Sequence, residues 1–105
     1  MDLIDATRFT ADRAWGSLPL MSMGDYRAKL HWTDQPYVWH ENDGEELFVV
    51  LDGVVDMHYA SSEHEAPRVV ELRPGQIAVF RAGDRHVAHP RGAARILVME
   101  RHDSE

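Results

Sequence analysis

The segment over residues 39–53 indicates the fold class of this chain most clearly: Trp39-His40-Glu41-Asn42-Asp43-Gly44-Glu45-Glu46-Leu47-Phe48-Val49-Val50-Leu51-Asp52-Gly53. A polar turn at Asp43-Gly44 precedes an apolar run over residues 47–51, and a second turn follows at Asp52-Gly53. An Asp-Gly pair beside apolar runs is a strong β-hairpin signal, because glycine tolerates the positive φ of a primed turn. The stretch therefore predicts short strands joined by tight turns.

The same alternation of short extended runs and turn residues continues from residue 25 onward. The turn Arg73-Pro74-Gly75-Gln76 fits type II, with proline presetting φ and glycine taking the positive-φ position. The sequence predicts eight strands, over Asp25–Trp32, Pro36–Glu41, Glu45–Asp52, Val54–Ala60, Pro67–Arg73, Gln76–Arg81, His86–Pro90 and Ala94–Glu100. Eight short strands at this spacing are typical of an all-β antiparallel sandwich or barrel.

The two ends of the chain differ from this pattern. Residues 1–24 are expected to form an N-terminal arm, either a short amphipathic helix or a loose leading segment. Gly16 and Pro19 would end any helix there. We expect the main domain to cover residues 25–100 and a C-terminal tail to cover residues 101–105.

Composition excludes several classes of function. The chain has 105 residues, which indicates one domain, and its 11 basic against 18 acidic residues give a net charge of −7. Such a surface repels phosphate backbones, so no nucleic-acid partner is expected. The longest uncharged apolar run, residues 47–51, is far shorter than the roughly 20 residues of a membrane span. Asp2, Asp5 and Arg8 interrupt the place of an export signal, so we expect a cytoplasmic protein.

The alternation of polar and apolar residues along the strands also indicates which strand faces are covered. The first predicted strand has one wet face: Tyr26, Ala28, Leu30 and Trp32 share one side, and Arg27, Lys29 and His31 the other. The runs over residues 47–51 and 96–99 are apolar on both faces, which requires a second layer over the outer side. The N-terminal segment or a second copy of the chain can supply that layer, and we expect a homodimer.

Side chains of the types that bind metals are concentrated in residues 39–53. His40 lies near the end of one predicted strand and Glu46 opens the next, so a turn at Asp43-Gly44 would bring His40, Asn42 and Glu46 together. Since cysteine is absent, any metal site must use histidine and carboxylate ligands. His86 follows a later strand and turn. Two histidines and one carboxylate bind a borderline divalent metal and can leave positions open for substrate.

These residues resemble the cupin family in its small single-domain bacterial form, the cupin type-2 kind. The first cupin motif has His-x-His, three or four residues, Glu, six residues and Gly. The chain matches it with His40, Asn42, Glu46 and Gly53, with asparagine at the second histidine. The second motif is matched in part: Gly75, Gly83 and His86 are kept, whereas Arg81 and Pro90 replace proline and asparagine. The resemblance covers roughly residues 25–100.

The resemblance implies a cupin-type jelly-roll β-barrel with a divalent metal ion inside. By carry-over the ligands are His40, Glu46 and His86, with Asn42 at the fourth place as a weaker, neutral donor. The metal is Fe, Mn, Ni or Zn. The resemblance implies a metal-dependent isomerase, epimerase or dioxygenase acting on a small molecule, and the alternative is a non-catalytic small-molecule-binding cupin that has lost its metal. Whether the chain is an enzyme stays open at this point.

Each of these residues also has a plainer interpretation. Glu46 could be a strand-end carboxylate paired with Arg81 or Arg85, although parity places it on the face of Phe48 and Val50, where an unpaired carboxylate is costly. His40 and His86 could be ordinary core histidines. Of the other histidines, we expect His89 and His58 on the outside of the barrel, and the sequence gives no role to His31, His64 and His102. Three aromatic residues could line a binding site or, more simply, belong to the core: Tyr26, Trp39 and Phe48.

Overall fold

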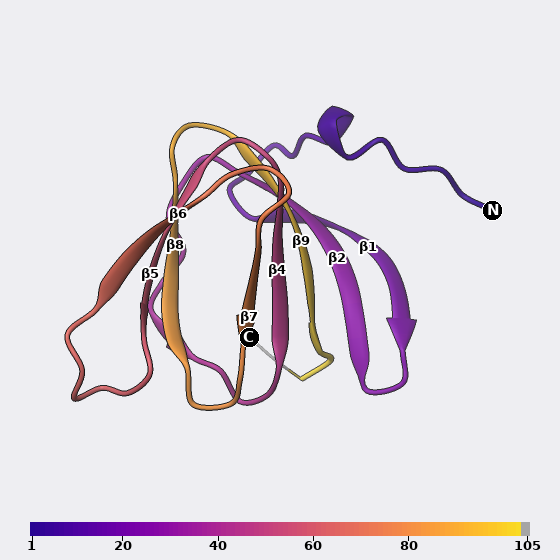
Figure 1. The fold of residues 1–105 in the computed structure, drawn as a ribbon. Coiled ribbons are helices and arrows are strands. Elements are labelled where there is room, and N and C mark those ends of the chain that lie inside the picture. Colours follow the sequence, from indigo (N-terminus) through magenta and orange to yellow (C-terminus); the bar gives the residue numbers. More distant parts are fainter. Residues whose placement is uncertain (104–105) are drawn as a thin grey trace.

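The computed structural model describes residues 1–103, which form two antiparallel sheets facing each other (Figure 1). The five-stranded sheet has the order β1 (Gly16–Met23), β2 (Tyr26–Thr33), β9 (Ala94–Arg101), β4 (Glu46–Asp52) and β7 (Ile77–Phe80). The four-stranded sheet has the order β3 (His40–Glu41), β8 (Arg85–Pro90), β5 (Val55–Ala60) and β6 (Arg68–Leu72). A short 3-10 helix, η1, covers Ala6–Arg8. The predicted all-β class is confirmed.

The hydrophobic core lies between the two sheets. Strands β4 and β9 of the five-stranded sheet bury alternate residues, as expected when one face of a strand looks inward. The inward residues of both sheets pack into one cluster, formed by Phe48, Val50, Val55, Met57, Leu72, Phe80, Ala88, Ala94, Ile96 and Val98. This cluster fills one part of the barrel and leaves the other part for polar side chains.

The turns were located correctly, but most of them join strands of different sheets. Asp52-Gly53 connects β4 in one sheet to β5 in the other, and the turn at Asp43-Gly44 likewise leads from β3 to β4. The predicted hairpins at these two places are therefore wrong. A turn signal specifies that the chain reverses, but not whether the next strand pairs with the first or crosses the barrel. Gly53 has φ 82°, and a Cβ there would lie 2.5 Å from a backbone carbonyl oxygen, so only glycine fits.

The N-terminal arm is shorter than the sequence indicates. Within residues 1–24, only Ala6–Arg8 are helical, whereas Gly16–Met23 form β1 and pair with β2 at the edge of the five-stranded sheet. Pro19 is compatible with an edge strand, where a missing N–H donor costs nothing, and a bulge follows it. The sequence does not indicate this strand, because glycine and proline here are typical of helix ends and of edge strands alike. At the other end, β9 includes Arg101, and residues 104 and 105 of the predicted tail lie outside the described residues.

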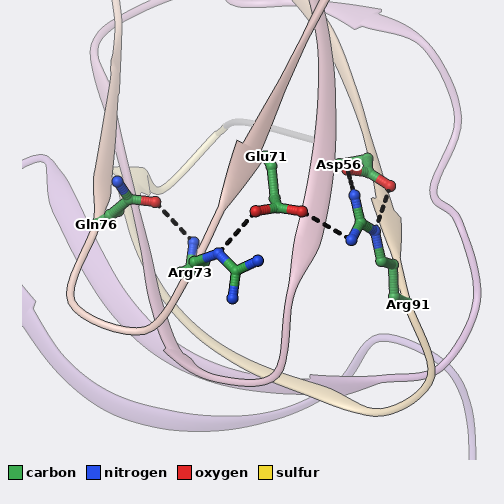
Figure 2. Close-up of polar contacts among 5 residues, drawn as sticks. All are labelled: Asp56, Glu71, Arg73, Gln76 and Arg91. Carbon is green, nitrogen blue, oxygen red and sulfur yellow. Dashed lines mark hydrogen bonds and ion pairs between the residues drawn. The ribbon is translucent and has the colours of Figure 1, made fainter.

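The outer faces of the two sheets differ in chemistry. The four-stranded sheet carries a charged network, in which Arg91 pairs with Asp56 and Glu71 at 2.8 and 2.7 Å and Arg73 pairs with Glu71 at 2.7 Å (Figure 2). Hydrogen bonds from Arg91 hold the pKa of Asp56 below its usual value. The five-stranded sheet instead presents an apolar outer face, defined here as Leu47, Val49, Ile77, Val79, Leu97 and Met99.

This apolar outer face is only partly covered in a single chain. Ile77 is 55% exposed and Val79 is 50% exposed, while helix η1 touches only part of β4.

Within the described residues no helix is long and apolar enough to cross a membrane.

Candidate metal centre

Three metal-ligating side chains meet at one wall of the barrel. His40 on β3 lies directly opposite His86 on β8 in the four-stranded sheet, and their ring centroids are 4.1 Å apart. Glu46 reaches them from the first position of β4 in the facing sheet. The ligand atoms of all three lie within 4.8 Å of one another. We call these three residues the His-Glu-His group.

Burial and stacking hold two members of the group firmly. His86 is 2% exposed and stacks on Phe80 with ring centroids 3.9 Å apart and planes 6° from parallel. Glu46 is 7% exposed, whereas His40 is half-buried. His40 Nδ1 lies 3.2 Å from the carbonyl oxygen of Val38, which fits an Nδ1–H donor and leaves Nε2 with its lone pair. A metal-binding histidine is commonly oriented by such a hydrogen bond.

Asn42 links the other two members. Its Oδ1 lies 2.6 Å from His86 Nε2, and its Nδ2 donates to Glu46 Oε1 at 3.0 Å and to the carbonyl of Gly44 at 3.3 Å. Glu46 Oε1 itself lies 3.3 Å from His86 Nε2. The other ring nitrogen of His86 is buried with no hydrogen-bond partner among residues 1–103. Asn42 therefore acts here as a hydrogen-bonding bridge inside the group.

The spacing and the chemistry of these donors fit a divalent metal ion. Nitrogen and oxygen ligands about 2.0–2.2 Å from a metal, at tetrahedral or octahedral angles, lie roughly 3.0–3.5 Å from each other. The 3.3 Å between Glu46 Oε1 and His86 Nε2 falls in that range, and the ligand atoms of all three residues lie within 4.8 Å of one another. Two imidazoles and one carboxylate form the donor set typical of non-haem Fe(II).

The structure brings together all four residues that the sequence predicted, but not in the predicted way. His40 and Glu46 meet across the barrel from two sheets, rather than on neighbouring strands of one hairpin. Among residues 1–103, Glu46 forms its ion pair with His86 and not with Arg81 or Arg85. The role of the four residues as ligands stays a prediction.

The His-Glu-His group opens onto a cavity of about 230 Å³. Three aromatic side chains, which we call the aromatic wall, border it: Trp15, Tyr37 and Phe48. Of the aromatic residues considered from sequence, only Phe48 borders this cavity, whereas Tyr26 borders a depression on the outer side and Trp39 is 42% exposed. Trp15 was missed because it lies before the first predicted strand. Tyr37 was missed although it lies within the predicted strand Pro36–Glu41, of which only His40–Glu41 form a strand.

The polar face of β2 is turned into this cavity, which corrects the prediction that it faces water. Arg27, Lys29 and His31 all border the cavity, while Ala28 and Leu30 on the opposite face are buried. Alternation shows which residues share a face, but not which face looks inward, and barrels can enclose polar ligand sites. The run of three basic residues at alternate positions was the signal that could have identified this wall.

Charges in the cavity perturb one another. Glu100 lies across from Arg27 in the β2–β9 register, with Oε1 3.4 Å from the guanidinium, and is 8% exposed. Burial, and then the nearby Glu46, raise the pKa of Glu100. Burial and the neighbouring Arg27 lower the pKa of Lys29, and burial lowers the pKa of His31. The cavity is therefore a site in which charged forms are costly unless they are paired.

Trp15 is held in an unfavourable backbone conformation at the cavity. Its φ is 59°, the left-handed region that bulky residues rarely adopt. Its carbonyl oxygen lies 3.2 Å from His31 Nδ1, and its ring packs edge-on against His31 and Tyr37 at 5.8 and 5.3 Å. Backbone strain of the kind seen at Trp15 is typical of functional sites.

His58 and His89 lie outside this cavity, on the strands that carry the charged outer network. Their ring centroids are 4.3 Å apart.

Comparison with known proteins supports a cupin fold. No protein-family model and no curated sequence matches the chain. Among solved structures, a cupin-2 domain protein from Shewanella frigidimarina is 25% identical, covers 88% of this chain and 85% of its own, and has a TM-score of 0.73. A cupin superfamily protein from Desulfitobacterium hafniense is 17% identical, with 93% and 87% covered and a TM-score of 0.76.

The same fold occurs as part of larger enzymes. A hydroquinone 1,2-dioxygenase from Sphingomonas, solved with 4-hydroxybenzoate bound, is 26% identical over 87% of this chain and has a TM-score of 0.76. That match covers only 28% of the dioxygenase chain, so the likeness concerns one domain of that enzyme. The predicted jelly-roll class of this chain is confirmed by these structures.

Proposed function

This chain is a small cupin domain, and we propose that it binds a divalent metal ion through His40, Glu46 and His86 and acts with it on a small molecule. The observation that carries the proposal is the spacing of these donors, all within 4.8 Å at the wall of a cavity. At an exposed site water would compete with the side chains for the metal ion, whereas two of these three side chains are buried. The site, rather than the fold alone, supports this proposal.

We propose Fe(II) as the metal and oxidation of the small molecule by dioxygen as the reaction, in preference to isomerase or epimerase chemistry. The donor set favours Fe(II), and similar folds occur in hydroquinone dioxygenases, one of them solved with Fe3+. When bound, the ion would act as a Lewis acid toward the substrate. The chain's own residues do the rest: Glu46 balances charge, Val38 orients His40, and the aromatic wall excludes water from the cavity.

Asn42 is proposed as a positioning residue that can also complete the donor set. Its Nδ2 holds Glu46 in place by the 3.0 Å hydrogen bond. Its Oδ1 sits beside His86 Nε2, at the place from which a fourth, neutral donor would reach the same ion. An amide oxygen is a weaker ligand than imidazole, so we expect weaker metal binding than with two motif histidines.

The first test is metal content per chain, measured by elemental analysis on tag-free protein purified without chelator and reloaded anaerobically with Fe(II). The parent is expected to hold close to one metal per chain. His40→Ala removes a half-buried ligand and is expected to lose the metal. His89→Ala, a histidine outside the cavity, is the matched control and should keep it. Equal metal in the parent and His40→Ala would refute the ligand assignment.

The alternative is a non-catalytic cupin that binds small molecules without metal. Two observations favour it: Asn42 already occupies His86 Nε2, and His86 Nδ1 has no partner to orient the ring among the described residues. The same measurement discriminates the two functions. Sub-stoichiometric metal that does not increase on reloading, and does not respond to His40→Ala, would select the alternative.

We also propose that the chain is a homodimer formed through the apolar outer face. The opposite sheet exposes a charged network suited to water, whereas this face leaves Ile77 and Val79 about half exposed. Apolar patches of this kind commonly mark protein interfaces. Light scattering should give twice the chain mass of 12.0 kDa for the parent and a single mass for Val79→Glu. A monomeric parent would refute the proposal.

A further inference from the structure

The wall of the cavity formed by β2 carries two cations side by side. Arg27 and Lys29 are two residues apart on β2 and both border the cavity, so their side chains share one face. Lys29 is the single lysine of the chain. A strand that places its only lysine beside an arginine inside a barrel works against charge repulsion, unless an anion occupies the space between them. We call these two residues the cation pair.

One carboxylate lies beside the cation pair. Glu100 pairs with Arg27 at 3.4 Å, and its charge also favours the protonated form of Lys29. Burial and the neighbouring Arg27 act in the opposite direction and lower the pKa of Lys29. No ion pair to Lys29 occurs within residues 1–103. An anionic ligand group beside both cations would therefore give Lys29 a partner.

The cavity is small, and the cation pair and Glu46 border it from the same sheet. Leu47 pairs with Met99, so the preceding Glu46 lies next to Glu100, which in turn pairs with Arg27. Neighbouring strands are about 4.8 Å apart, so the backbones at Arg27 and Glu46 are separated by roughly 9.5 Å, with β9 between them. With a volume of about 230 Å³, the cavity fits a compact molecule rather than an extended chain.

We infer that the cavity takes a small organic carboxylate, whose anionic group pairs with Arg27 and Lys29. Its planar, apolar body lies against Trp15, Tyr37 and Phe48, and its far end points to the His-Glu-His group. The inference deepens the proposed function by naming the ligand class. It rests on that function only for the far end, because the cation pair and the aromatic wall need no metal.

The single lysine allows a direct test of the anionic end. Reductive methylation of the full chain modifies two amines, Lys29 and the N-terminal amine of Met1, which mass spectrometry of peptides separates. With benzoate at about ten times its Kd, mass action leaves about a tenth of the sites empty, so methylation of Lys29 should slow about tenfold. The N-terminal amine is the internal control and should react at an unchanged rate. Failure of benzoate to protect Lys29 would overturn the inference.

Two further probes test the ligand's chemistry. Benzamide has the same planar body without the charge, and inorganic phosphate has charge without the planar body. Both should protect Lys29 about tenfold less well than benzoate, because hydrogen bonds to charged groups and contacts with the aromatic wall each contribute to binding. Equal protection by benzamide would refute the role of the cation pair. Equal protection by phosphate would refute the planar carboxylate and indicate a general anion site.

Substitutions separate the cation pair from surface charge. Lys29→Met and Arg27→Met each should weaken benzoate binding, followed by tryptophan fluorescence or calorimetry, by about tenfold or more. Lys29→Arg keeps the charge and should retain binding, which also shows that changes at this position are compatible with folding. Arg68→Met, at an exposed position of β6, makes the same charge change outside the cavity and should bind like the parent. Undiminished binding by both methionine variants would overturn the inference.

The same titration in chelator-treated protein keeps this inference apart from the proposed function. Benzoate binding that needs the cation pair, in protein that takes up no metal, would support the ligand class and refute the metal site. Full metal loading with no benzoate binding would refute the ligand class and leave the metal site intact.

Discussion

Replacing Glu46 by glutamine is expected to have opposite effects on stability with and without metal. Glu46 is 7% exposed, accepts a hydrogen bond from Asn42 at 3.0 Å and lies 3.3 Å from His86 Nε2. Glutamine keeps the shape and the accepting oxygen but removes the charge. Burying a carboxylate costs several kcal/mol even after relaxation. In chelator, Glu46→Gln should therefore be at least as stable as the parent.

Metal should reverse this order. Free metal at one hundred times its Kd stabilises the parent by about 2.7 kcal/mol, which for a domain of this size raises Tm by about 10–20 °C. If loss of the anionic ligand weakens binding a hundredfold, the same metal concentration equals Kd for the variant. The variant then gains only about 0.4 kcal/mol, or about 2–3 °C.

The assay is thermal unfolding of parent and Glu46→Gln in chelator and in anaerobic Fe(II). Glu45→Gln is the matched control, because Glu45 is an exposed carboxylate next in sequence. It should behave like the parent in both conditions. The reasoning is refuted if Glu46→Gln unfolds several degrees below the parent in chelator while metal leaves the parent's Tm unchanged. Glu46 and His86 would then form a structural pair of the core.

Three other substitutions test separate parts of the structure. Burial lowers the pKa of His31, so as pH falls the unfolded chain binds a proton before the folded chain does, and stability decreases below about pH 6.5. His31→Gln should therefore make Tm less dependent on pH in this range. An unchanged slope of Tm against pH would contradict this. Gly53→Ala should lower the free energy of unfolding, measured in urea, by about 1–2 kcal/mol because of its positive φ, and by more because of the contact with the carbonyl oxygen. Gly92 also has a positive φ but has open space around it, so Gly92→Ala should lose only the contribution of the positive φ. Asn42→Asp places a second carboxylate beside Glu46, so calorimetry should show tighter metal binding and thermal unfolding a lower Tm in chelator; unchanged metal affinity would contradict the position assigned to Asn42.

Local chemistry was sufficient to predict most strands and the convergence of the site. Parity placed Glu46 on the face of Phe48 and Val50, and all three are buried. The turn at Arg73–Gln76 closes with a 3.0 Å hydrogen bond between those residues, and Gly75 has the expected positive φ. These features depend on neighbours in sequence, so the sequence carries them directly.

The features that were missed depend on long-range arrangement. Whether the chain crosses the barrel after Asp43-Gly44 depends on which sheet accepts the next strand, and that pairing is formed with β9 and β7 from much later in the chain. Strand β1 is defined by its pairing with β2 rather than by its own alternation. Trp15 reaches the cavity through a positive φ that no local pattern announces.

The polar cavity and the apolar outer face have a common origin in the two-residue period of the strands. Because β2 turns Arg27 and Lys29 to the cavity, its apolar alternate residues Ala28 and Leu30 lie on the other face, together with the outward residues of β9 and β4. Ala28 and Leu30 are buried, whereas Ile77 and Val79 on the edge strand β7 are about half exposed, so this edge of the apolar face needs a cover. A second copy can supply the cover without touching the cavity. We accordingly expect Val79→Glu to become monomeric while its benzoate binding stays at the parent's level; loss of both together would show that the cavity is completed by the partner.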